Sequence, residues 1–411
     1  MGAQQFLTDG VLLDTTGLSR VLRFDAERGI IEVEAGIQWP ALLKHLLAAQ
    51  RDSQNVWTFA QKQTGANKFC LGGAVGSNIH GRGLKMKPFI SDIESLTLID
   101  ASGRLVPCSR TENRELFRLV VGGYGLFGVV YSVALRLVPR RKLQRVVEML
   151  DLDDAMAAFG RRIEDGFLYG DFQFAIDPAS NDFLKRGIFS SYCPAPLDTP
   201  MAPRKKLPTR AWLDLVYGAH VQPTRAFEEY ARYYKSTSGS IYWSDLHQLS
   251  GYVDDFHEEV DRRAGTKHSA SEIITEVYVP RNLVAEFMAD AREDFRRNKV
   301  ELIYGTIRLV ERDDESFLAW ARESYACIIF NLHTVHTPQG IQHSAEAFRR
   351  LIDLAASRRG RYYLTYHKFA SRRQLEDCYP EFSAFLALKR KFDPQGLFQS
   401  DWYRHYRNGS N

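Results

Sequence analysis

Two glycine-rich segments constrain the fold of this chain more than any other feature of its sequence. The first is LGGAVGSNIHG at residues 71–81, and the second is GGYGLFGVV at residues 122–130. Glycine lets backbone N–H groups approach an anion or a flat ring closely, where any Cβ would obstruct. Both segments are therefore candidate ligand-binding loops. The alternative is that they are tight turns without a ligand.

The order of elements around the second segment argues against a Rossmann domain. The segment matches GxGxxG through Gly123, Gly125 and Gly128, but a dinucleotide fingerprint must follow a strand and open a helix. Here residues 113–121 have a helical pattern, and apolar residues alternate with others over residues 129–137, as in a half-buried strand. The helix comes first, so its dipole cannot bind a pyrophosphate at this loop.

The rest of the chain has α+β patterning. Residues 29–37 favour a strand, Pro40 then opens a helix at its preferred first position, and residues 95–100 and 104–108 flank a tight turn as in a hairpin. Pro139 ends the strand after the second glycine segment. We therefore expect a domain boundary near residue 140 and a separate substrate-covering domain over residues 141–385.

Composition excludes several classes of protein. The chain has 411 residues, 45% of them hydrophobic, which is enough to bury a full core. Its 54 Lys and Arg against 50 Asp and Glu leave a net charge of +4, without the long basic runs of a nucleic-acid binder. No apolar run approaches the roughly 20 residues of a membrane span, and no signal peptide is evident. Peripheral membrane association stays open.

Five cysteines lie far apart without CxxC spacing, namely Cys70, Cys108, Cys193, Cys327 and Cys378. This usage is typical of a reducing compartment and indicates a cytoplasmic protein. His333 and His336 lie three residues apart on a strand-like run, but the sequence offers no third ligand beside them. We therefore predict no metal.

Several motifs together carry a family resemblance. Residues 36–139 contain LGGAVGSNIHG, SLTLIDASG, ENRELF and GGYGLFGVV, and they resemble the FAD-binding domain of the vanillyl-alcohol oxidase/p-cresol methylhydroxylase flavoprotein family. Residues 378–406 (CYPEFSAFLALKRKFDPQGLFQSDWYRHY) resemble the closing segment of its sugar and polyol oxidases. These include alditol oxidases, aldonolactone oxidases and decaprenylphosphoryl-ribose oxidase.

The resemblance implies an α+β flavoprotein of two domains. Residues 1–140 would form the FAD-binding domain, residues 141–385 a cap with a large antiparallel sheet flanked by helices, and residues 386–411 a segment that returns to the FAD domain. Residues 1–6 resemble the tail of the family's pyrophosphate loop. We therefore expect the first βαβ unit to be missing, which leaves both FAD affinity and covalent attachment open.

The resemblance also assigns the cofactor residues. One group would line the pyrophosphate and flavin: Gly72, Gly73, Gly76, Ser77, His80 and Gly81. Another would lie along the adenosine: Gly123, Gly125, Gly128 and Val129.

Alcohol oxidation by a flavin needs a group that accepts the hydroxyl proton and positive charge near the ring that becomes anionic on reduction. Lys368 and His367 end an aromatic run, YYLTYHK, that resembles the His-and-Lys motif of aldonolactone and alditol oxidases. Lys368 is the first catalytic candidate. The alternative is an exposed lysine beside a packed histidine.

Three further candidates lie on strand-like runs. Arg308 resembles an active-site arginine of alditol oxidases, Glu276 a substrate-contact position of the ribose oxidase, and Cys327 its active-site cysteine. Each has a structural alternative: an arginine pointing outward, an exposed strand carboxylate and an inert core thiol.

These residues predict an FAD-dependent oxidoreductase. It would oxidise a CH–OH group of a sugar, polyol, aldonolactone or glycosyl carrier by hydride transfer to flavin N5, with oxygen or another carrier as electron acceptor. One alternative is an FAD-linked dehydrogenase or reductase that avoids oxygen. The other is a truncated remnant without catalytic activity.

Overall fold

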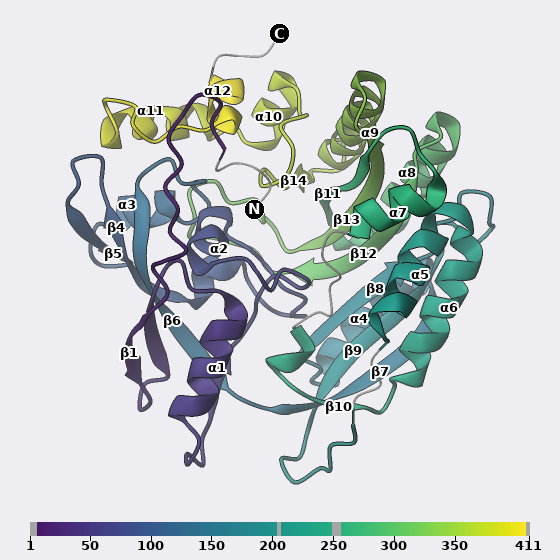
Figure 1. Cartoon of the computed structure of the whole chain (residues 1–411), viewed down its shortest axis with the longest axis horizontal. Helices are drawn as coiled ribbons and strands as arrows, with labels where there is room; N and C mark the ends of the chain where they lie inside the picture. Colours follow the sequence, from purple (N-terminus) through teal and green to yellow (C-terminus); the bar gives the residue numbers. More distant parts are fainter. Residues whose placement is uncertain (1–5, 204–206, 249–255, 408–411) are drawn as a thin grey trace.

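The computed structural model describes residues 6–203, 207–248 and 256–407, so residues 1–5 of the predicted loop tail lie outside it. Two antiparallel sheets lie side by side (Figure 1). The N-terminal sheet has the order β1-β2-β6-β4-β5, and β3 also pairs with β6. Its strands are β1 (Val21–Asp25), β2 (Ile30–Glu34), β3 (Trp57–Phe59), β4 (Ile93–Ile99), β5 (Leu105–Ser109) and β6 (Val129–Pro139).

Short helices accompany this first sheet: α1 (Trp39–Ala49), α2 (Leu71–Ser77), η1 (Phe89–Asp92) and α3 (Arg114–Val120). Helix α1 forms where the sequence predicts it, with Pro40 in its first turn and one apolar face buried. The predicted hairpin is β4–β5. Its turn closes on Gly103 at φ +79°, a conformation that glycine adopts without strain.

The second sheet has the order β10-β7-β9-β8-β12-β13-β11-β14. Every neighbouring pair in it is antiparallel, which confirms the predicted α+β class with a large antiparallel cap sheet. Its strands are β7 (Lys142–Asp151), β8 (Tyr169–Phe174), β9 (Arg186–Ala195), β10 (Ile241–Trp243), β11 (Ala270–Pro280), β12 (Leu302–Val310), β13 (Tyr325–Val335) and β14 (Arg361–Tyr362).

Helices flank the second sheet, and three more follow it in sequence (Figure 1). The flanking elements are α4 (Leu152–Glu164), α5 (Thr209–Val221), α6 (Pro223–Ser236), η2 (Leu246–Gln248), α7 (Phe256–Ala264), η3 (Arg281–Leu283), α8 (Val284–Asn298) and α9 (Pro338–Ala356). The last three are α10 (Arg372–Cys378), α11 (Phe382–Phe392) and α12 (Asp401–Arg407).

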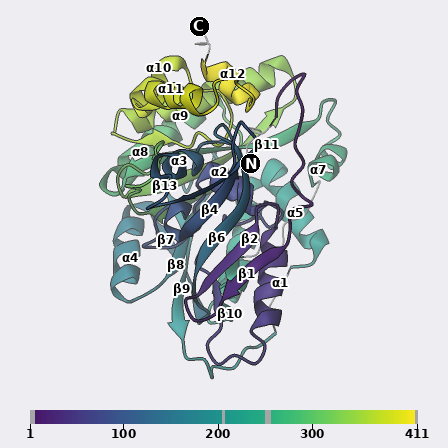
Figure 2. The same cartoon turned by 90° about the vertical axis from the view of Figure 1, so that its left-hand side faces the viewer.

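The C-terminal helices lie at one end of the molecule (Figure 2) and contact residues of the second glycine segment. The ring of Phe127 packs edge-on against Phe385 of α11 at 5.1 Å, and the ring of Tyr124 lies 4.8 Å from that of Trp402 in α12. The indole N–H of Trp402 also donates to the carbonyl of Leu364, which follows β14. The C-terminal helices therefore contact both the second glycine segment and the residues that follow β14 at the edge of the second sheet.

Two local predictions were wrong. Residues 71–77 form helix α2 and not a loop, because Leu71, Ala74 and Val75 bury an apolar face and the Cys70 thiol accepts from the N–H of Gly73. The aromatic run at residues 362–368 is a strand only at its start. Its later carbonyl at Leu364 bonds to the Trp402 side chain instead of a neighbouring strand.

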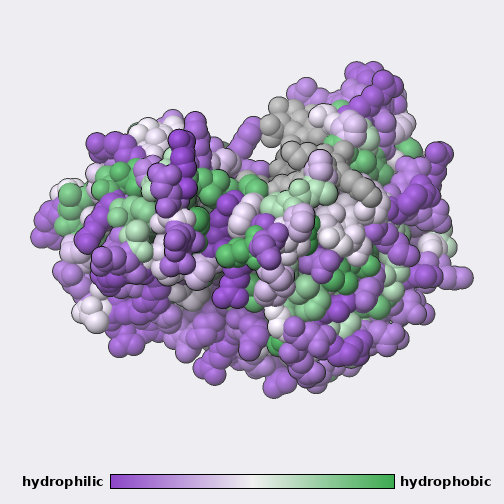
Figure 3. Space-filling view, turned by 90° about the horizontal axis from the view of Figure 1, so that it is seen from below, coloured by the Kyte–Doolittle hydropathy of each residue, from purple (hydrophilic) through white to green (hydrophobic). Residues whose placement is uncertain are grey.

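Within the described ranges, no helix is long and apolar enough to cross a bilayer. Hydrophilic side chains cover most of the surface seen from below, with smaller hydrophobic areas among them (Figure 3).

Candidate active site

A buried carboxylate, Glu276, is the centre of a polar cluster between the two sheets. Its side chain is fully buried. Four side chains contact it: His80 Nε2 at 2.7 Å, Tyr278 Oη at 2.5 Å and Cys327 Sγ at 3.2 Å from Oε1, and Tyr366 Oη at 3.3 Å from Oε2. His80 comes from the first glycine segment and the others from the second sheet region. Segments far apart in the chain therefore meet here, since His80 and Glu276 are separated by 196 residues.

Strand register places the members from the second sheet on one face. Side chains alternate along a strand, so Glu276 and Tyr278 share a face of β11. Tyr278 pairs with Cys327 on β13, and Cys327 pairs with Arg308 on β12. Directly opposed residues lie on the same side of an antiparallel sheet. The face that carries Glu276 therefore also carries Cys327 and Arg308.

His80 is held by the turn that ends α2. Asn78 ends the helix in the left-handed conformation (φ 45°), its carbonyl accepts from the Trp320 indole N–H, and its side chain bonds to Asp313. The His80 ring then packs 5.2 Å from the Trp320 ring. These contacts fix the direction in which the imidazole points.

The His80 ring lies between two acceptors. Its Nδ1 is 3.0 Å from the carbonyl of Gly81, and its Nε2 faces the Glu276 carboxylate. A neutral imidazole has only one N–H to donate. Both contacts are satisfied when the ring carries two protons and forms an ion pair with an ionised Glu276.

The surroundings of Glu276 favour its ionised form. Burial by itself would raise the pKa of Glu276, but His80, Tyr278 and Cys327 outweigh it and hold that pKa below its ordinary value. Burial raises the pKa of Cys327 and of Tyr366 well above their usual ranges. At neutral pH the cluster therefore contains one carboxylate among protonated thiol and phenol groups.

Arg308 brings a positive charge to this face without a partner. Arg308 is 7% exposed, and its Nε is buried without a hydrogen-bond partner. Within the described ranges, no hydrogen bond or ion pair of its guanidinium is found. The charge of Arg308 also acts on Lys62, which is fully buried. Burial, and then repulsion from Arg82 and Arg308, lower the pKa of Lys62 to about 7. An unpaired buried arginine is costly, so this position suits an oxygen-rich or anionic ligand.

The two glycine segments lie against each other. The N–H of Gly122 donates to Val75 and that of Tyr124 to Gly76, each at 2.9 Å. A Cβ added to Gly76 would meet only the nitrogen of Gly125, at 3.8 Å, and one added to Gly125 would meet nothing within 4 Å. A small cavity opens at this junction, lined by Gly72, Gly76, Val120, Gly123, Gly125, Leu126, Phe127, Gly128 and Val130.

This junction fits FAD through Gly76 and Gly125. The space beside each of these glycines is free of side-chain atoms of other residues. Within the described chain the N–H of Gly125 has no hydrogen-bond acceptor. The start of α2 does not offer its donors, because Leu71 N–H bonds to Ile37 O and Gly72 N–H to Ala35 O. These residues would therefore hold the cofactor by close backbone approach rather than by a helix N-terminus.

Most of the other predicted cofactor glycines have close neighbours that leave little or no room for a Cβ. A Cβ on Gly123 would lie 1.9 Å from the carbonyl oxygen of Leu119, and one on Gly128 would lie 2.5 Å from that of Ile99. A Cβ on Gly81 would lie 2.9 Å from the Lys62 carbonyl and one on Gly72 3.2 Å from Ala35, whereas one on Gly73 would have only the Cys70 sulfur nearby. Ser77 is buried and its carbonyl accepts from Tyr363, while Val129 begins β6 half-buried.

Lys368 and His367 do not join the buried cluster. Lys368 is exposed, and its charge acts on Asp401 and His405 of α12. His367 stacks on Phe369 with ring centroids 5.0 Å apart, and burial lowers its pKa. Tyr366, two residues before Lys368, is the side chain of the aromatic run that contacts Glu276. The placement favours Arg308 over Lys368 as the positive charge beside the reacting group.

Sequence reasoning missed Tyr278, Tyr366, Lys62 and Arg82. Tyr278 could have been found from strand alternation, since it lies two residues after Glu276. Tyr366 lies within the predicted aromatic run, but only the turn after β14 directs it inward. Lys62 and Arg82 gave no signal, because their burial depends on Gln248, Asp171 and the carbonyl of His247, all more than 85 residues away in sequence.

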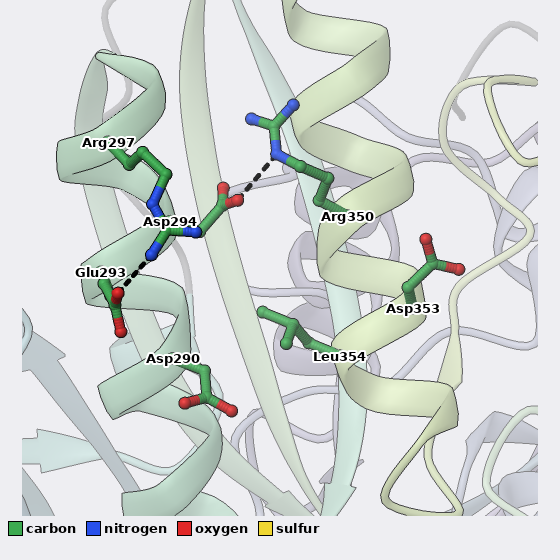
Figure 4. A pocket seen from close by; sticks show the side chains of 7 residues that line it. All are labelled: Asp290, Glu293, Asp294, Arg297, Arg350, Asp353 and Leu354. Carbon is green, nitrogen blue, oxygen red and sulfur yellow. Dashed lines mark hydrogen bonds and ion pairs between the residues drawn. The ribbon is translucent and has the colours of Figure 1, made fainter.

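A hollow of about 420 Å³ between α8 and α9 lies apart from this cluster (Figure 4). Its lining is mostly charged: Asp290, Glu293, Asp294, Arg297, Arg350, Asp353 and Leu354. Arg350 pairs with Asp294 at 2.7 Å, and Arg297 pairs with Glu293. Because its arginines are neutralised and none of the predicted site residues lines it, this hollow is not the site of the flavin chemistry.

Two family models match the chain. Residues 1–109 match an FAD binding domain, and residues 202–406 match D-arabinono-1,4-lactone oxidase. The chain is 24% identical over 405 residues to L-gulono-1,4-lactone dehydrogenase of Mycobacterium tuberculosis, covering 97% of this chain and 86% of the relative. It is 22% identical over 411 residues to decaprenylphosphoryl-beta-D-ribose oxidase of Mycolicibacterium smegmatis, covering 96% and 84%.

A shorter match reaches higher identity. L-gulonolactone oxidase of Bos taurus is 33% identical over 138 residues, which cover 33% of this chain and 30% of the relative. Among solved structures, a solvent-stable cholesterol oxidase superposes with a TM-score of 0.68 at 16% identity, over 96% of this chain and 85% of that one. The resemblance to the vanillyl-alcohol oxidase/p-cresol methylhydroxylase flavoproteins is therefore confirmed, and the chain is an FAD-linked oxidoreductase.

Proposed function

We propose that this enzyme oxidises a CH–OH group of a sugar-derived lactone or a closely related polyhydroxylated molecule. The observation that carries the proposal is the buried Glu276 beside the unpaired Arg308 on one face of the second sheet. The names of its full-length relatives, an aldonolactone dehydrogenase and a ribose oxidase, support the substrate class.

Glu276 is the proposed proton acceptor. Oxidation of the alcohol breaks its O–H and C–H bonds and forms a C=O bond; the proton passes to the carboxylate, and the hydrogen on carbon leaves with two electrons. When bound, FAD supplies the acceptor for that hydride. His80 stabilises the carboxylate before the transfer through its contact with Oε1. The Tyr366 hydroxyl donates its hydrogen to Oε2, so its oxygen can accept a hydrogen bond from a substrate hydroxyl.

Arg308 is the proposed electrostatic partner. Its guanidinium would donate hydrogen bonds to a substrate oxygen or balance the negative charge that develops when hydride is transferred. Lys62, buried nearby, adds positive charge when protonated. Since water is excluded from this region, these charges act more strongly than they would at the surface.

The electron acceptor that reoxidises the flavin is proposed to be oxygen or another carrier. The relatives include oxidases and a dehydrogenase, and the relative that covers 97% of this chain is named a dehydrogenase. A dye acceptor compared with oxygen under otherwise equal conditions will distinguish them. A cytoplasmic location is also proposed, supported by five free thiols.

The test is anaerobic flavin reduction, which keeps the electron acceptor out of the measurement. Purified FAD-containing enzyme would be mixed with L-gulono-1,4-lactone or D-arabinono-1,4-lactone, and bleaching of the flavin band would be followed by stopped flow. Glu276→Gln keeps the shape of the side chain and removes its basicity. We expect the variant to reduce at least ~100-fold more slowly, the usual range for loss of a general base.

Glu94→Gln is the matched control, since Glu94 is a partly exposed carboxylate that pairs with Arg136 on the first sheet. Its reduction rate should equal that of the parent. Parental reduction rates in Glu276→Gln would refute the role of Glu276. Protein that lacks FAD even when the cofactor is supplied would instead support the remnant alternative.

A further inference from the structure

Three histidines surround a second carboxylate, Glu272. His220 Nε2 lies 3.2 Å and His333 Nδ1 3.6 Å from Glu272 Oε1, and His257 Nδ1 lies 2.7 Å from Oε2. The donor atoms of His220, Glu272 and His333 all lie within 4.8 Å of one another. The sequence suggested only the pair His333 and His336. Glu272 and His220 lie 61 and 113 positions before His333 in the chain.

The fold builds this cluster from four elements. Glu272 on β11 pairs directly with His333 on β13, so both side chains lie on one face of the sheet. His220 comes from the last turn of α5 and His257 from the first turn of α7. The two helices therefore place their histidines over the same point of the sheet.

The contacts of His220 and His333 with Glu272 are compatible with a tetrahedral ion between them. Zinc bonds of ~2.0–2.1 Å to nitrogen and oxygen place neighbouring ligand atoms about 3.3 Å apart, close to the separations around Glu272. The ring nitrogens of His220 and His333 that face the carboxylate do not meet hydrogen-bond geometry with it or with any other described group. They are thus oriented for an acceptor of their lone pairs.

The cluster is mostly enclosed by the protein. Side chains of Glu272, His220 and His333 are 6%, 9% and 13% exposed, so water reaches them only in part. Imidazole and carboxylate groups must give up their protons to bind a metal ion, so protons and the ion would compete for this cluster.

The structure holds a similar group in the proposed active site, and it is a different case. His80, Glu276 and Cys327 also lie within reach of one another, but His80 donates to Gly81 and Glu276 bonds to two tyrosines as well. Those groups are satisfied by the protein itself. By contrast, His220 Nε2 and His333 Nδ1 have no hydrogen-bond partner among the described residues.

We propose that His220, Glu272 and His333 form a binding site for a divalent transition-metal ion of the zinc type, while His257 contacts the other carboxylate oxygen of Glu272. Imidazole and carboxylate ligands suit zinc, and water would complete a tetrahedron around three protein ligands. The ion would fix α5 to β11 and β13. It requires neither FAD nor substrate.

The experiment is a titration of the FAD-containing enzyme with zinc chloride. Protein would first be dialysed against EDTA and then metal-free buffer, and zinc binding would be followed by calorimetry at pH 7.5, with magnesium chloride as a comparison ion. We expect one zinc per chain and no heat of binding from magnesium. Metal analysis of protein purified without chelator should likewise show up to one zinc per chain.

Variants test the ligands. His220→Gln and His333→Gln should each weaken zinc binding at least 10-fold, while His45→Gln, which alters an exposed histidine of α1, should bind zinc as the parent does. The parental titration decides the matter even if a variant fails to fold: absence of stoichiometric zinc binding would overturn the site. Equal zinc affinity in folded His220→Gln, His333→Gln and His45→Gln would overturn it as well.

Discussion

Strand β11 carries two glutamates four residues apart, Glu276 fully buried and Glu272 partly buried, and the groups around them differ. Glu276 meets His80 from the first glycine segment, so its cluster exists only where the two sheets meet. Glu272 meets three histidines from the second sheet and its own helices. Four residues of strand span about 13 Å. The same residue type can thus serve the reaction at one end of a strand and hold helices at the other.

The neighbours of each carboxylate explain the difference. Around Glu276 the phenols and thiol stay protonated, and the positive charge of Arg308 is left unpaired for a ligand. Around Glu272 the ring nitrogens converge on the carboxylate itself. In the first cluster the unfilled partner is therefore the Arg308 guanidinium, which suits an oxygen of a substrate, and in the second it is a pair of ring nitrogens, which suit a metal ion.

The largest expected effect separates Arg308 from the rest of the second sheet. Arg308→Met keeps an apolar side chain of similar reach and removes the charge. Loss of one preorganised charged donor costs on the order of 3 kcal/mol of barrier, so flavin reduction should slow about 100-fold. FAD content should stay unchanged if the glycine junction holds the cofactor. Stopped-flow reduction at the parental rate would remove Arg308 from the proposed reaction.

The second prediction asks whether the two glutamates are independent. Glu272→Gln removes one charged ligand and leaves the histidines, so zinc affinity should fall at least 10-fold and any stabilisation by zinc should shrink with it. Flavin reduction should change by less than about twofold. The measurements are zinc calorimetry, thermal unfolding with and without zinc, and stopped flow. A large loss of reduction rate would show that the sites are coupled.

The third prediction concerns pH and Lys62. The pKa of Lys62 is lowered to about 7 in the folded chain, first by burial and then by Arg82 and Arg308, against about 10.4 when unfolded. Between these values the unfolded chain binds more protons, so the free energy of unfolding should rise with pH, by up to ~1.4 kcal/mol per pH unit. Lys62→Met should remove this slope between pH 7.5 and 9.5 in denaturant titrations of enzyme without added ligand. An unchanged slope would contradict the lowered pKa.

The smallest effect is expected at Lys368. Because this lysine is exposed and interacts with charges of α12, Lys368→Met should change flavin reduction by less than about twofold. Surface substitutions of this kind usually alter stability by no more than about 0.5 kcal/mol. A 100-fold slower reduction by the same stopped-flow assay would restore Lys368 as the catalytic charge and weaken the case for Arg308.

The glycine segments show which features local sequence patterns can predict. The order of a helix followed by a strand around Gly123 was predicted and argued against a Rossmann domain, and α3 and β6 have that order. The helical state of residues 71–77 was not readable, since two adjacent glycines disfavour a helix unless tertiary packing buries its apolar face. Which glycines leave room for a ligand was also hidden. That depends on atoms such as the Leu119 and Ile99 carbonyls, which only the folded chain brings near.

The sequence by itself determined the α+β class and the principal strands and helices of the first third, because periodicity and motif order are local properties of the chain. The resemblance to a known family added Glu276, Cys327 and Arg308 as candidates. Tertiary structure decided which candidates meet. It turned Lys368 outward and Tyr366 inward, joined His80 to Glu276, and collected His220 and His257 around Glu272 and His333. Sheet register and helix packing set these distances, and both arise from contacts between residues far apart in the chain, which no local pattern encodes.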